Sequence, residues 1–215
     1  MTWVTGVVSV VAALADSPLL AAWTVGLTTD TDNGVTWWHP RRVPAHRLVV
    51  VAAVASVLAA CAARGTPFPA WWLFAAGGAV LCVVDTQHHL LPARMVYPLA
   101  AAISVTVVLA AVLAGEPGPV LRAVLAAAVV GGGWFAVAFI TPIQCGSGDV
   151  RVAALAAGLL GWVSWSAVLA GQLAAFLLAA VTAGIIAATR PTAGRPTQVP
   201  MGPALIVGAL AVTWL

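Results

Sequence analysis

Two aspartates stand out as residues that could do chemistry in this sequence of 215 residues. Asp85 follows a long apolar run and precedes the polar stretch Thr86–His89, and Asp149 follows Gly146 and Gly148. Two carboxyl groups a few ångström apart in a medium of low dielectric constant cannot both ionise, so they share one proton. One of them then takes a proton from water while the other donates a hydrogen bond to a carbonyl oxygen. If Asp85 and Asp149 converge, they have the chemistry for peptide hydrolysis.

The same two aspartates also have a purely structural interpretation. Each lies at the end of an apolar run, and Asp149 stands where it would cap the positive N-terminal end of a helix. The glycines at 146 and 148 favour the chemical interpretation, because a backbone without side chains lets an extended substrate strand approach closely. The spacing of the two aspartates in the sequence and their depth in a membrane do not by themselves decide between the two interpretations.

The elements that must position these residues are membrane helices. Hydrophobic residues make up 62% of the chain and charged residues only 7%, and the mean hydropathy is +1.06, whereas about a quarter of the residues of a soluble domain are charged. A membrane span needs about 20 apolar residues, so eight spans leave no room for a sizeable soluble domain. The composition excludes disordered chains and soluble enzymes. It also excludes nucleic-acid partners, because a formal net charge of +3 is too small and scattered to bind phosphates.

We therefore predict an all-α fold, a polytopic transmembrane helix bundle of about eight spans that forms a single integral membrane domain over residues 1–215. The apolar stretch from 152 to 189 is too long for one span, so we divide it near Gly161–Ser164. Asp16 and Pro18 leave open a break or a re-entrant turn within the first span. The predicted spans cover residues 3–27, 46–63, 69–85, 95–114, 119–141, 149–163, 165–189 and 200–215.

The arginines predict the orientation of these spans. With the N-terminus outside, only Arg64 and Arg122 lie at outer ends of spans. The other arginines lie at inner ends: Arg41, Arg42, Arg47, Arg94, Arg151, Arg190 and Arg195. Because positively charged loops stay on the cytoplasmic side, the distribution places Asp85 and Asp149 at the same depth, at the cytoplasmic end of the bilayer.

The sequences around the two aspartates resemble the type IV prepilin peptidase family, the bacterial branch of the GxGD membrane aspartyl proteases. In that family one Asp is followed by a polar stretch and Leu-Pro or Ile-Pro, and the other ends a Gly-x-Gly-Asp motif. The resemblance covers about residues 46–215. It rests on an ordered set of segments: Arg64–Gly65, Val83–Pro92, Pro92–Pro98, Gln144–Arg151, Gly161–Trp162 and Val199–Leu205.

The resemblance implies an endopeptidase that cleaves the basic leader from prepilin-like precursors in the bacterial inner membrane, at its cytoplasmic face. It implies Asp85 and Asp149 as the catalytic dyad and no cofactor. We also expect Gly146, Gly148, His88, His89 and Pro92 to contact the substrate. We expect no metal, because no third ligand accompanies the two histidines.

The chain differs from larger members of the family in the loop that follows the first span. After the first span (1–27), the cytoplasmic loop shrinks to residues 28–45, has no cysteine, and leads directly into the peptidase core (46–215). We therefore predict a short member that lacks the cytoplasmic domain associated with methylation, and we do not expect N-methyltransferase activity. The oligomeric state does not follow from the sequence.

Three other functions remain open. The presenilin and signal-peptide-peptidase branch also has Gly-x-Gly-Asp and a Pro-Ala-Leu like that at Pro203–Leu205, but its first Asp usually follows Tyr, and here Val84 precedes Asp85. A proton-coupled transporter could use intramembrane carboxylates as a relay, although it would more naturally have inverted repeats. An inactive assembly factor could keep the fold without the activity.

Overall fold

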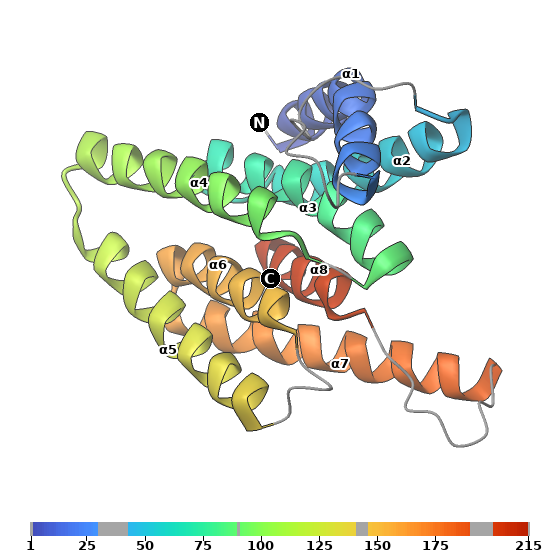
Figure 1. The fold of residues 1–215 in the computed structure, drawn as a ribbon. Coiled ribbons are helices and arrows are strands. Elements are labelled where there is room, and N and C mark those ends of the chain that lie inside the picture. Colours follow the sequence, from blue (N-terminus) through green and yellow to red (C-terminus); the bar gives the residue numbers. More distant parts are fainter. Residues whose placement is uncertain (1, 30–42, 90, 141–145, 190–199, 215) are drawn as a thin grey trace. The chain divides into compact units, whose positions relative to one another are not determined.

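The computed structural model describes residues 2–29, 43–89, 91–140, 146–189 and 200–214, and every regular element within these ranges is a helix (Figure 1). The predicted spans agree with the observed helices to within three residues at every end but the last, where α8 stops early and a 3-10 turn, η1 (Val212–Trp214), follows. The helices are α1 (Thr2–Thr29), α2 (Ala45–Ala62), α3 (Phe68–His88), α4 (Ala93–Ala114), α5 (Gly118–Ile140), α6 (Ser147–Val163), α7 (Trp165–Thr189) and α8 (Met201–Ala211).

Length and composition identify six of these helices as candidate membrane spans. The other two, α6 with 17 residues and α8 with 11 residues, are shorter. The predicted polytopic helix bundle is confirmed, and the chain is a multi-pass membrane protein. Whether α6 and α8 cross the whole bilayer stays a prediction.

The helices gather into two compact units. The first unit contains α1 to α4 together with Thr213 and Trp214, and the second contains α5 to α8. The predicted division into a first span, a loop and a core stays a prediction, because most of the loop 28–45 lies outside the described residues.

In the first unit, α3 is the helix that the others surround. It packs against α1, α2 and α4, and its buried side chains run almost continuously from Ala70 to Asp85. Trp71 and Phe74 are fully buried and meet edge to face, with ring centroids 6.3 Å apart. This burial on all sides explains why α3 is apolar around its whole circumference rather than along one stripe.

The first helix passes through Asp16 and Pro18 as one continuous element, so neither a break nor a re-entrant turn occurs there. Proline has no N–H to donate to the carbonyl four residues earlier, which here belongs to Leu14. The hydroxyl of Ser17 donates to that Leu14 carbonyl oxygen at 2.7 Å. A neighbouring serine thus supplies the hydrogen bond that Pro18 removes, as serines and threonines do in membrane helices.

In the second unit, α6 packs against α5, α7 and α8, and its contact with α5 is made by small residues. A Cβ built on Gly131 would lie 2.9 Å from the Cβ of Ala154, and one built on Gly161 would lie 2.7 Å from the Cβ of Ala126. Small residues let membrane helices approach closely enough for backbone packing. The α5–α6 pair therefore depends on these positions staying small.

The division of the long apolar stretch near Gly161–Ser164 is confirmed. Ser164 is extended and separates α6 from α7. Its hydroxyl oxygen accepts the N–H of Ala167 at 3.0 Å, which caps the start of α7. A single residue is therefore enough to reverse the chain.

Candidate functional site

Asp85 lies in the last turn of α3, and its side chain is only 4% exposed. The helix ends three residues later at His88, and the next residue, His89, adopts a left-handed conformation (φ 50°, ψ 40°) and donates its N–H to the carbonyl oxygen of Asp85 at 2.8 Å. Pro92 then precedes α4, so that a proline prevents the helix from continuing. The chain thus places a buried carboxylate one turn before a sharp change of direction.

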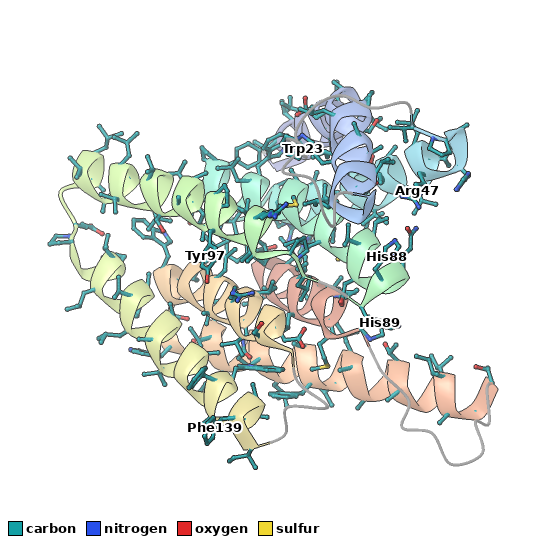
Figure 2. The ribbon with its side chains drawn as sticks, viewed as in Figure 1. Trp23, Arg47, His88, His89, Tyr97 and Phe139 are labelled. Atoms are coloured by element: carbon teal, nitrogen blue, oxygen red, sulfur yellow. The ribbon has the colours of Figure 1, made fainter. Side chains whose placement is uncertain are left out.

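The residues after Asp85 are exposed, in contrast to Asp85 itself. Thr86 and Gln87 are exposed, and His88 and His89 lie at the end of α3 (Figure 2). The hydroxyl of Thr86 donates back into the helix, at 2.9 Å from the carbonyl oxygen of Cys82. This end of the first unit therefore presents a polar, accessible segment directly beside a buried aspartate.

Asp149 lies in the first turn of α6 and is half-buried. Its Oδ2 accepts the backbone N–H of Gly146 at 3.1 Å, and its own N–H donates to the carbonyl oxygen of Gly146 at 3.1 Å. Gly148 is half-buried and Gly146 is exposed. The Gly-x-Gly-Asp motif is therefore a helix start in which the aspartate caps the backbone.

The residues predicted for the site thus form two groups. Asp85, His88, His89 and Pro92 share the junction between α3 and α4 in the first unit, and Gly146, Gly148 and Asp149 share the start of α6 in the second. The convergence of the two aspartates stays a prediction. Within the described part of the chain, no three His, Cys, Asp or Glu side chains gather closely enough to hold a metal ion.

Comparison with protein families gives one match. Residues 72–188, more than half of the 215 residues, match the type IV leader peptidase family. The chain belongs to the type IV leader peptidase family. The matched stretch contains both Asp85 and Asp149. Neither the curated proteins nor the solved structures gave a match to this leader peptidase.

Membership of this family makes the chain a type IV leader peptidase-like protease with several membrane helices. Two structural features of this leader peptidase could not be found by reasoning from the sequence. Arg122 of α5 donates to the carbonyls that end α6, and Arg64 lies over the ring of Trp214. Both contacts join residues 39 or more positions apart, and no local pattern indicates either of them.

Proposed function

We propose that this leader peptidase is a membrane aspartyl endopeptidase that removes the basic leader from type IV prepilin-like precursors, with Asp85 and Asp149 as its dyad. The observation that carries the proposal is that the family match includes both aspartates, and that each lies within one turn of the end of its helix. A carboxylate in that position can meet both water and a peptide strand. A carboxylate in the middle of a span meets neither.

The surroundings of the two carboxyl groups support different roles for them. Asp149 lies at the positive end of α6 and accepts the N–H of Gly146, and both features stabilise a negative carboxylate. Because a close pair of carboxyl groups shares one proton, we assign Asp149 as the general base and Asp85 as the member that holds the proton.

The reaction then has two steps. Asp149 takes a proton from water as the water oxygen bonds to the carbonyl carbon, and Asp85 gives its proton to the carbonyl oxygen. The resulting tetrahedral intermediate carries two hydroxyl groups. The C–N bond breaks as Asp149 protonates the leaving amine and one hydroxyl returns its proton to Asp85, which restores the starting state. Atoms and charges balance without a cofactor.

The substrate fits the predicted orientation of the chain. A prepilin-like precursor has a basic leader in the cytoplasm, then a small residue, usually Gly, and then an apolar helix in the membrane. Its scissile bond lies at the inner surface of the bacterial cytoplasmic membrane, the depth that the arginine distribution predicts for both aspartates. We propose that the exposed residues His88, His89 and Gly146, together with the half-buried Gly148 and Pro92, contact this segment.

The test is cleavage of a pilin-type precursor from the same genome by purified enzyme in lipid vesicles. Asp85→Asn and Asp149→Asn keep the side-chain shape, and we expect each to lower the rate by about 10³-fold or more. Asp16→Asn is the matched control, since Asp16 is a half-buried acid in α1, and we expect it to stay within about threefold of wild type.

Three results would count against the proposal. Wild-type cleavage rates in Asp85→Asn or Asp149→Asn would remove that residue from the dyad. A new N-terminus inside the apolar helix, detected by mass spectrometry, would favour a presenilin-like activity. Proton-coupled uptake that is lost in both variants while cleavage persists would favour a transporter.

A further inference from the structure

Thr213 and Trp214 belong to the first unit, although α8, which leads into them, belongs to the second. The hydroxyl of Thr213 donates to the carbonyl oxygen of Cys61, in the last turn of α2, at 2.8 Å. The guanidinium carbon of Arg64 lies 4.0 Å from the ring centroid of Trp214, and tryptophan is the aromatic ring that attracts cations most strongly. Two different contacts therefore attach this segment to the end of α2.

In the first unit, this attachment lies at the end far from Asp85. The turn between α2 and α3 is short, and the indole N–H of Trp71 donates to the carbonyl oxygen of Thr66 at 3.3 Å, so Arg64 is next to the start of α3. Asp85 comes 17 residues after Phe68, the first residue of α3. At about 1.5 Å per residue, that separation is about 25 Å.

The fourth helix returns to the same end of the first unit. It lies along α3 (Figure 1), and a Cβ built on Gly77 of α3 would lie 2.5 Å from a methyl carbon of Leu99. From Leu99, α4 continues to Ala114, towards the end at which α3 begins. The chain leaves the first unit directly afterwards, after Glu116. Both connections to the second unit therefore start at the end far from Asp85.

In the second unit, the first of these connections reaches the end far from Asp149. Arg122, in the second turn of α5, donates to the carbonyl oxygens of Gly161 and Trp162, each at 2.5 Å, and to that of Val163 at 3.0 Å. The start of α5 is thus beside the end of α6. Asp149 precedes Gly161 by 12 residues, or about 18 Å along the helix.

The second connection reaches the same end. A Cβ built on Gly208 of α8 would lie 2.7 Å from the backbone nitrogen of Ala175 and 2.9 Å from the carbonyl oxygen of Gly171, both in the first half of α7. Gly171 in turn lies against the side chain of Leu160, in the last turn of α6, so this part of α8 is close to the end of α6. In each unit, therefore, both connections lie at one end and the candidate aspartate lies at the other.

We propose that Thr213, Trp214 and Arg64 are positioning residues of the peptidase, which close a second fixed link between the two units at the ends remote from the aspartates. This inference rests on the proposed function. With a single connection after Glu116, one unit could turn about that connection, whereas a second connection, fixed to the end of α2 through Thr213 and Trp214, restricts such turning. A rotation of about 10° acting over about 20 Å moves the far end by roughly 3.5 Å. Misplacing reacting groups by only about 1 Å can slow a reaction about 10²-fold. The attachment of Thr213 and Trp214 to the end of α2 therefore has to hold its position during the reaction.

The experiment compares Trp214→Leu and Arg64→Met with Trp214→Phe, the matched control that keeps an aromatic ring for Arg64. Thr213→Val keeps the side-chain volume but removes the hydrogen-bond donor. This variant replaces Trp214→Leu or Arg64→Met in the comparison if either of them does not fold. Each variant is measured in two ways in lipid vesicles. One is the kcat and KM for a pilin-type precursor. The other is the distance distribution between spin labels at positions 94 and 139, in a background with the native cysteines replaced by alanine.

We expect Trp214→Leu and Arg64→Met each to broaden the distance distribution and to lower kcat by about 10- to 100-fold, with KM within about threefold. Trp214→Phe should keep both near wild type, and the double variant should be no worse than either single variant, because both act through one link. An unchanged distance distribution, whatever the rate, would overturn the proposal, and so would losses that multiply in the double variant. If wild type does not cleave the precursor, the proposed function fails, while the label distances still test the link.

Discussion

Arg122→Met tests how the short helix α6 is terminated. The last carbonyl oxygens of a helix have no hydrogen-bond donor within the helix. In a membrane, few water molecules are available to donate to them instead. Arg122 donates to three of these carbonyls at once, those of Gly161, Trp162 and Val163. Met keeps the helix-forming tendency of Arg in α5 but has no donor, so the variant removes only these bonds.

The size of the effect follows from the exposure of the three bonds. The bonds to Gly161 and Trp162 are partly buried, whereas the bond to Val163 is exposed. In Arg122→Met, water can therefore donate in place of the arginine only to the carbonyl oxygen of Val163. A buried carbonyl that loses its donor costs about 1–3 kcal/mol, and two of them lower the free energy of unfolding by about 2–6 kcal/mol. Arg122→Lys should lose about half as much, because an ammonium group lacks the planar fork that reaches separate carbonyls.

The assay is reversible unfolding in mixed detergent micelles, followed by circular dichroism. The control is Arg94→Met, which removes an exposed arginine from the first turn of α4 and should change the free energy of unfolding by less than about 0.5 kcal/mol. If Arg122→Met and Arg94→Met unfold alike, the carbonyl bonds do not stabilise the pair of helices and the reasoning is wrong.

The same assay checks two other packing predictions. Gly208→Ala should cost about 1–3 kcal/mol, because its Cβ would lie 2.7 Å from a backbone nitrogen of α7; Gly184→Ala, with open space around it, should be neutral or stabilising by up to about 1 kcal/mol. Trp134→Phe removes the 3.1 Å hydrogen bond from the indole N–H to Gln172 while an aromatic ring can still stack on Phe176, so it should cost about 0.6–1.7 kcal/mol. Gln172→Leu should not add to that loss, and full additivity would show that the bond contributes nothing.

The sequence was sufficient to predict the helices, because each apolar run is bounded by charges, prolines or glycines, and even the single-residue break at Ser164 follows from length. The sequence was not sufficient to predict that the helix continues through Pro18, because this depends on the hydroxyl of Ser17 donating to the carbonyl oxygen of Leu14. For the site, the sequence predicted that Asp85 and Asp149 lie at helix ends. The capping of α6 by Asp149 agrees with its predicted place at a helix start. The burial of Asp85 depends on packing, which no motif encodes.

The two arginines that oppose the predicted orientation both have partners in the structure. Counting charges leaves Arg64 and Arg122 at outer ends of spans, against seven arginines at inner ends. Arg64 lies over the ring of Trp214, and Arg122 caps the last carbonyls of α6. The positive-inside rule concerns charges in loops that must stay out of the membrane during insertion, whereas these two charges stabilise contacts between elements of the folded protein. Their positions are therefore explained by packing, and they do not count against a cytoplasmic location for the proposed dyad.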